Sequence, residues 1–165
     1  MATVGCLMLL AGSLGLGSAG AATIVALGAS NTFGKGVARN QAYPAQLEAI
    51  LHARGYRVRV INAGMNGATT GDMLRRLGAA VPGGTSVVIL QPGGNDRRKG
   101  AETYRAPNVA EIQSRLHARG IRLVMLENSM LHGLPHQPDG QHLTPEGYRM
   151  LAESIAGQVA GAIGK

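Results

Sequence analysis

From residue 22 onward the chain alternates short runs rich in β-branched residues with longer amphipathic stretches. This alternation is typical of a parallel sheet whose strands are joined by crossover helices. The predicted strands are 23–27, 57–62, 86–91 and 122–127, and the predicted helices are 44–54, 70–81, 108–119 and 145–162. No long low-complexity linker interrupts residues 23–165, so we predict a single α/β domain with right-handed crossovers.

The composition agrees with one soluble domain and excludes several other classes. With 165 residues, 45% of them hydrophobic, the chain is long enough to bury a core. The net charge of +7 comes from arginines scattered along the chain, with one Phe, four Tyr and no Trp to stack on bases, so we predict no nucleic-acid partner. Cys6 is the only cysteine, which excludes a disulfide framework and a thiolate metal cluster.

The first 22 residues form an apolar segment without a charged side chain. The run ends in Ser18-Ala19-Gly20-Ala21-Ala22, which is similar to the cleavage site of a signal peptide, although the basic start of such peptides is missing. Gly12, Gly15, Gly17 and Gly20 weaken a helix, and together with the lack of flanking basic residues they argue against stable membrane insertion. We therefore predict a periplasmic or secreted domain over 23–165, with a cytoplasmic location as the alternative.

An internal repeat links two helix ends to the strands that follow them. Residues 51–58, LHARGYRV, return as LHARGIRL at 116–123. In both copies the glycine stands where a helix ends in the left-handed conformation, and His and Arg suit the negative end of the helix dipole. The repeat is thus interpreted as structural, and His52 and His117 are not predicted to be catalytic.

A glycine-flanked turn, residues 28–36, follows the first predicted strand. It does not fit a phosphate-binding P-loop, because five residues separate Gly28 from Gly34 and no Ser or Thr follows Lys35. It also lacks the Gly-x-Ser-x-Gly elbow, since Thr32 occupies the place of the second glycine. The turn nevertheless presents one hydroxyl, that of Ser30, beyond the end of a strand.

Polar blocks recur further along the chain. Asn66-Gly67 follows the second strand, Gly93-Gly94-Asn95-Asp96 follows the third, and Asp139-Gly140-Gln141-His142 comes after the fourth. Because the carboxyl ends of parallel strands meet at one edge of the sheet, we expect all four blocks to converge there.

These four blocks resemble those of the SGNH hydrolases, or GDSL family: a Gly-Asp-Ser turn, a Gly, a Gly-x-Asn-Asp and an Asp-x-x-His. By matching position, the resemblance implies that Ser30 is the nucleophile, His142 the base and Asp139 the residue that orients it. It further implies an oxyanion hole made of the Ser30 and Gly67 backbone N–H groups and the Asn95 side chain.

Elementary chemistry supports these roles independently. A serine hydroxyl needs an adjacent base, and imidazole suits that task near neutral pH. Asp139 lies three residues before His142 on a glycine-containing turn, close enough to fix the imidazole tautomer. Thr144 as helix cap and Pro145 as first helical residue would hold this turn rigid. His132 and His136 are interpreted as solvated loop residues.

The sequence departs from the family pattern in two ways. Ala29 replaces the aspartate that helps to order the nucleophile loop in the family. Only eleven residues separate Glu127 from Asp139, where the family usually inserts another helix and a fifth strand. Residues 131–138 are too few for either, so we predict about four strands.

The combined prediction is a flavodoxin-like three-layer α/β/α domain, strand order 2-1-3-4, acting as a serine esterase through an acyl-enzyme. Its partner would be a small-molecule ester: an aryl or alkyl ester, a thioester, a lysophospholipid or an acetylated sugar. No cofactor is implied, and the spacing of Asp96, Asp139, His136 and His142 matches no metal motif. The alternative is a non-catalytic flavodoxin-like or degenerate SGNH ligand-binding module. The sequence carries no signal for an oligomeric state.

Overall fold

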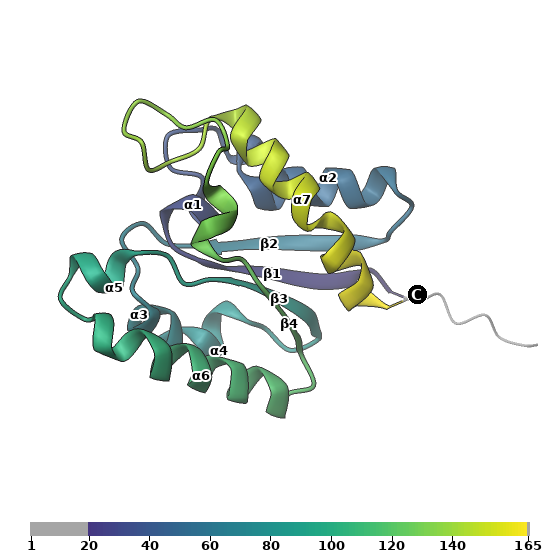
Figure 1. Cartoon of the computed structure of the whole chain (residues 1–165). Helices are drawn as coiled ribbons and strands as arrows, with labels where there is room; N and C mark the ends of the chain where they lie inside the picture. Colours follow the sequence, from purple (N-terminus) through teal and green to yellow (C-terminus); the bar gives the residue numbers. More distant parts are fainter. Residues whose placement is uncertain (1–19, 165) are drawn as a thin grey trace, which may run out of the picture.

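A four-stranded parallel sheet forms the centre of the molecule, which a computed structural model describes over residues 20–164 (Figure 1). The strands are β1 (Ala22–Gly28), β2 (Val58–Gly64), β3 (Thr85–Gln91) and β4 (Arg122–Met125). Their order across the sheet is β2-β1-β3-β4, and all three neighbouring pairs are parallel. The predicted fold class, strand number and strand order are therefore confirmed.

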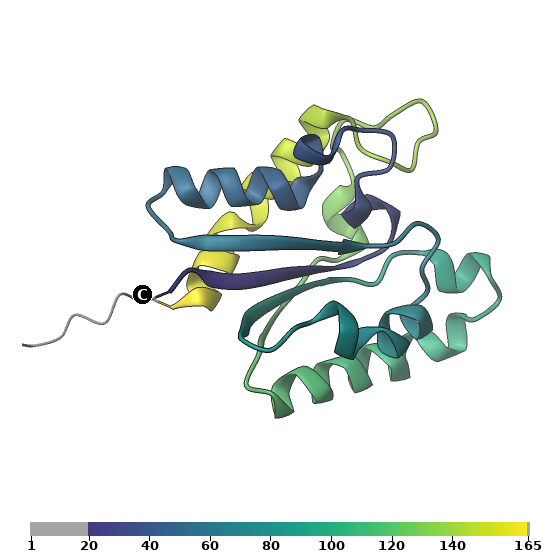
Figure 2. The same cartoon turned by 180° about the vertical axis from the view of Figure 1, so that it is seen from behind.

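Helices cover both faces of the sheet (Figures 1 and 2). Helices α2 (Tyr43–Ala53) and α7 (Pro145–Ile163) pack on one face, and α3 (Thr70–Arg75), α4 (Leu77–Ala80) and α6 (Glu102–Ala118) cover the other. Short elements complete the chain: α1 (Ser30–Phe33), a 3-10 turn η1 (Arg39–Gln41), α5 (Asn95–Arg98) and a second 3-10 turn η2 (Asn128–Leu131).

The two faces of the sheet bury two separate apolar clusters. Ile24 of β1 belongs to the cluster beneath α2 and α7, whereas the next residue, Val25, belongs to the cluster beneath α3 and α6. Val87 and Val88 of β3 divide in the same way. Successive side chains of a strand point to opposite faces, so the middle of each central strand, residues 24–27 and 87–90, is apolar without a break.

The predicted helix ends agree with the structure. The Thr144 hydroxyl accepts a hydrogen bond from the Gly147 N–H, and Pro145 is the first residue of α7. Gly55 and Gly120 follow α2 and α6 with φ values of 84° and 68°, the left-handed conformation that the repeat predicted. The His52 ring bonds the Val58 carbonyl at 2.7 Å, which supports its structural interpretation.

Two predicted helices have different bounds in the structure. The helix expected over 70–81 divides into α3 and α4 at Arg76, whose guanidinium donates to the carbonyls of Gly28 and Ala63 at the ends of β1 and β2. The helix expected over 108–119 begins at Glu102 and continues through Pro107. Pro107 cannot donate a backbone hydrogen bond, and the helix nevertheless continues through it.

The amino-terminal prediction concerns residues that are mostly not described. Of the predicted signal segment 1–22, residues 1–19 lie outside the described residues, and β1 begins at Ala22. Within 20–164, no helix has the length and apolar character needed to cross a membrane.

The end of β2 lies directly against the backbone of α1. A Cβ atom placed on Gly64 would lie 2.1 Å from the Phe33 nitrogen and 2.5 Å from the Phe33 Cα. The Asn62 side chain spans the same contact, accepting from the Gly64 N–H at 2.9 Å and donating to the Phe33 carbonyl at 3.3 Å. This close approach fixes α1, and with it Ser30, against the sheet.

We predict that Gly64→Ala lowers the free energy of unfolding by about 1–3 kcal/mol, because the added methyl group must displace backbone atoms. The matched control is Gly157→Ala, an exposed position in α7 where a Cβ meets nothing within 4 Å. It should stabilise the helix by up to about 1 kcal/mol. Urea unfolding measures both, and a Gly64→Ala protein as stable as wild type would contradict the close contact.

Candidate active site

Ser30 is the first residue of α1, immediately beyond the end of β1. Its carbonyl accepts hydrogen bonds from the N–H groups of Gly34 and Lys35, both at 3.0 Å. Gly34 ends α1 with φ of 83°, a conformation that favours glycine. The single helical turn between two glycine-containing segments therefore presents the Ser30 hydroxyl at the carboxyl edge of the sheet.

Side chains of α1 attach this turn to the rest of the site. Asn31 donates to the Gln141 carbonyl at 3.1 Å and accepts from the Tyr148 hydroxyl at 3.0 Å. Burial raises the pKa of Tyr148 to about 12, so its hydroxyl remains a donor. On the other side, Thr32 donates to the Gln91 side chain at 3.0 Å. No local sequence pattern predicts these contacts of Asn31 and Thr32, because their partners lie far away in the chain.

Ala29 itself is buried and packs in an apolar cluster, where the family pattern has aspartate. It precedes α1 without any side-chain cap. The bonds of Asn31 and Thr32 thus hold the turn that carries Ser30.

Ser30, His142 and Asp139 form one hydrogen-bonded series. His142 Nε2 lies 2.9 Å from Ser30 Oγ, and His142 Nδ1 lies 2.5 Å from Asp139 Oδ2. The other carboxylate oxygen of Asp139 accepts from the backbone N–H groups of His142 and Gln141, at 3.0 and 2.9 Å. The ring of His142 and these two N–H groups hold the pKa of Asp139 well below its ordinary value.

The predicted oxyanion donors are the Asn95 side chain and the backbone N–H groups of Ser30 and Gly67. Asn95, buried at the start of α5, donates through Nδ2 to the Ala68 carbonyl at 2.8 Å and accepts from Arg98 at 2.6 Å. An amide NH₂ has two donors, so one remains available. Within 20–164, the backbone N–H groups of Ser30 and Gly67 have no hydrogen-bond acceptor.

Asp96, the neighbour of Asn95, is fully buried and has a structural role. Its carboxylate accepts from the Thr70 hydroxyl at 2.6 Å and from the Thr70 N–H at 3.1 and 3.2 Å. Asn108 of α6 donates to the same hydroxyl at 3.1 Å. Asp96 therefore connects α5 to the start of α3, and its oxygens face these partners.

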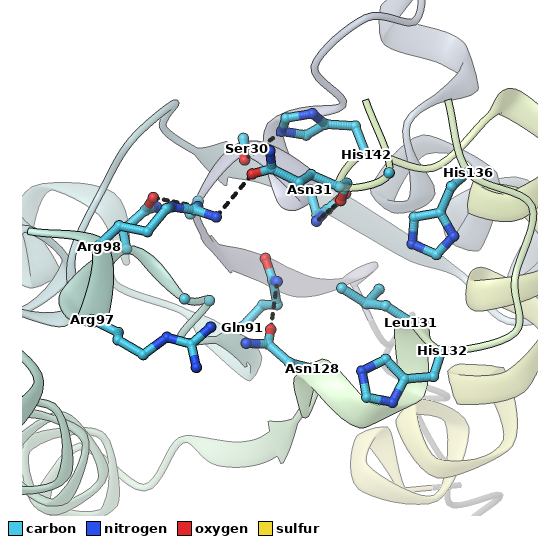
Figure 3. A pocket seen from close by; sticks show the side chains of 16 residues that line it. Ser30, Asn31, Gln91, Arg97, Arg98, Asn128, Leu131, His132, His136 and His142 are labelled. Atoms are coloured by element: carbon cyan, nitrogen blue, oxygen red, sulfur yellow. Dashed lines mark hydrogen bonds between the residues drawn. The ribbon is translucent and has the colours of Figure 1, made fainter. Parts of the chain in front are cut away.

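A pocket of about 220 Å³ opens beside Ser30 (Figure 3). Ser30, Asn95 and His142 line it, whereas Gly67 and Asp139 are not among the described residues at its surface. Two side chains at its wall, His132 and His136, were interpreted as solvated loop residues; the structure places both beside the site. His132 directly follows the 3-10 turn η2, whereas His136 pairs with Leu143 in an isolated bridge, and no local sequence pattern predicts either placement.

Comparison with known proteins identifies the same family as the four polar blocks. The model of the GDSL-like lipase/acylhydrolase family matches residues 26–160, which contain all four blocks. Esterase TesA of Pseudomonas aeruginosa is 31% identical over 125 residues, which cover 72% of this chain. The chain spans 62% of the length of that relative.

Solved structures share the fold. The chain is similar to the crystal structure of TesA, with a TM-score of 0.76 and 22% identity over 85% of this chain and 99% of that one. It is also similar to the psychrotrophic esterase EstA from Pseudoalteromonas sp., with a TM-score of 0.75 and 16% identity over 87% and 99% of the two chains. For AlinE4, an SGNH-hydrolase family esterase, the TM-score is 0.60 and the identity 25% over 86% and 73%. Because the family match extends over most of the sequence and the fold agrees, this chain belongs to the GDSL-like lipase/acylhydrolase family, the SGNH hydrolases.

Proposed function

We propose that this chain is a serine esterase that hydrolyses carboxylic esters through an acyl-enzyme. The observation that carries the proposal is the series Ser30–His142–Asp139, with Ser30 Oγ 2.9 Å from the imidazole and the imidazole 2.5 Å from the carboxylate. A nucleophile bonded to a base, and a base bonded to an orienting group, is the arrangement that acyl transfer requires.

The reaction proceeds in two halves. Ser30 Oγ attacks the ester carbonyl while His142 Nε2 takes the hydroxyl proton, and Asp139 stabilises the resulting imidazolium. The carbon–oxygen bond to the alcohol then breaks, and His142 returns its proton to the leaving oxygen. In the second half His142 removes a proton from water, the resulting hydroxide attacks the acyl-enzyme, and the acid leaves as Ser30 recovers its proton.

Three donors would stabilise the negative charge that develops on the carbonyl oxygen: the Ser30 and Gly67 N–H groups and the free hydrogen of the Asn95 amide. Arg98 supports the Asn95 assignment, because its guanidinium donates to Asn95 Oδ1 and so directs the NH₂ group away from itself. Donors held in place before the reaction act without reorganising when charge appears.

The pH profile tests the His142 and Asp139 roles. Asp139 stays ionised over the working range because its pKa is lowered, so only His142 has to lose a proton before it can act as a base. We predict that kcat/KM falls on the acid side with the slope of one proton. Asp139→Asn should lower kcat by roughly 10²–10⁴-fold, because the imidazolium loses its stabilising charge.

The matched control is Glu146→Gln. Glu146 is another carboxylate with a lowered pKa, paired with Arg149 at the start of α7. Its removal should leave the profile unchanged. An acid limb with the slope of two protons, or an Asp139→Asn enzyme as active as wild type, would contradict the assignment.

The pocket supports a short acyl group. Its volume of about 220 Å³ is below the roughly 300–1,000 Å³ of pockets for drug-sized ligands. Besides glycine, the apolar residues at its surface are Ala29 and Leu131. Met130 packs against the core instead, and Met65 is exposed, so neither provides a wall for a long chain.

A panel of 4-nitrophenyl esters from acetate to decanoate tests the activity and this preference together. We predict that kcat/KM is highest at two to four carbons, because further methylenes find no apolar surface and so do not gain the roughly 0.8 kcal/mol of a buried CH₂. Ser30→Ala should remove the activity by roughly 10³-fold or more. A steady rise toward decanoate would overturn the short-chain preference, and no turnover of any ester would favour the alternative, a ligand-binding module.

We also propose export of the domain, on the apolar composition of residues 1–22 and the small residues 18–22. Mass spectrometry of the protein from its native cells should find a mature chain that begins near Ala21 or Ala22. An intact Met1–Thr23 peptide in the cytosolic fraction would contradict export.

A further inference from the structure

The wall of the active-site pocket beyond Ser30 is rich in hydrogen-bond donors and cations (Figure 3). Arg97 and Arg98 enter it from α5, and Asn128, His132 and His136 enter it from η2 and the segment after it. The described residues at its surface include no aspartate or glutamate. A pocket of this kind differs from an acyl-binding groove, which needs apolar walls.

Arg97 has no partner for its charge. Within the described part of the chain its guanidinium forms no hydrogen bond and no ion pair. In Figure 3 its side chain extends from α5 toward the side of the pocket where Asn128 lies. Arg98 contacts only the neutral amide oxygens of Asn95 and Gln141, so its positive charge is also not neutralised there.

A chain of side-chain hydrogen bonds determines which atoms of Asn128 remain free at the pocket. Thr32 donates to Gln91 Oε1, and Gln91 Nε2 donates to Asn128 Oδ1 at 3.3 Å. Because the Asn128 oxygen is occupied, its NH₂ group is the part that remains free for a ligand. The pocket wall therefore combines amide and guanidinium donors with the ring nitrogens of His132.

We propose that the ester hydrolysed here carries a carboxylate on its acyl or alcohol part, bound between Arg97 and Asn128. A carboxylate only accepts hydrogen bonds, and its pairing with a guanidinium is charge-assisted, so it matches a wall of donors with an unpaired Arg. This inference rests on the proposed esterase function and specifies its substrate class. Arg97 would act as a binding residue for the substrate charge.

Matched ester pairs test the inference and identify the side that carries the charge. For the alcohol side the pair is 4-acetoxybenzoate and 4-acetoxybenzamide; for the acyl side it is the 4-nitrophenyl monoester of adipate and its methyl ester. The readout is the ratio of kcat/KM for the anionic over the neutral member. A ratio cancels any general loss of activity in a variant.

We expect the ratio to exceed one for at least one pair in the wild-type enzyme. Arg97→Gln should lower that ratio by about two- to fivefold, the usual size for an exposed charge contact, and 0.5 M salt should weaken it. The control is Arg59→Gln, which removes the same charge from an exposed position in β2. It should leave the ratio unchanged.

Ratios at or below one for both pairs, or equal effects of Arg97→Gln and Arg59→Gln, would overturn the inference while leaving the esterase function intact. If neither neutral nor anionic esters were turned over, the proposed function would fail instead. Titration calorimetry with 4-hydroxybenzoate and 4-hydroxybenzamide would then decide whether the pocket binds a carboxylate through Arg97. Tighter binding of the anion that is lost in Arg97→Gln supports this site, and equal binding refutes it.

Discussion

The hydrogen bond between Ser30 and His142 joins two residues 112 positions apart, and the rest of the site depends on it. Ser30 is held by the end of β1, and His142 by the turn that precedes α7. The parallel sheet brings these places together because its carboxyl edge collects the chain after every strand (Figure 1). Asn31 reinforces the contact by bonding the Gln141 carbonyl next to His142.

The turn that carries Ser30 is held without the aspartate of the family's Gly-Asp-Ser pattern. At that position this chain has Ala29, which packs in an apolar cluster. The turn is supported instead by Tyr148 through Asn31 and by Gln91 through Thr32. Gly64 adds a steric constraint, because its lack of a side chain allows the end of β2 to lie against α1.

Periodicity was sufficient to predict the sheet, because the central strands β1 and β3 carry apolar runs and the repeat with Gly55 and Gly120 marks two helix ends. The polar blocks predicted that Ser30, Asn95, Asp139 and His142 lie at one edge of the sheet, since strand ends converge for topological reasons; their catalytic roles stay a prediction. The break at Arg76 was missed, because its cause is a contact with carbonyls of two distant strands. The pocket wall was missed for a similar reason: His132 and His136 lie in the segment after η2, where His136 pairs with Leu143, and no short-range pattern predicts this path.

Covalent labelling tests the central claim, that Ser30 is the nucleophile activated by His142, most directly. The purified chain would be treated with an ethyl 4-nitrophenyl phosphonate and analysed by intact mass and peptide mapping. The account predicts one adduct per chain, on Ser30, and a rate of labelling that falls sharply in His142→Ala but not in His136→Ala. An adduct on another residue of the wild-type chain, or equal labelling of His142→Ala and wild type, would contradict it.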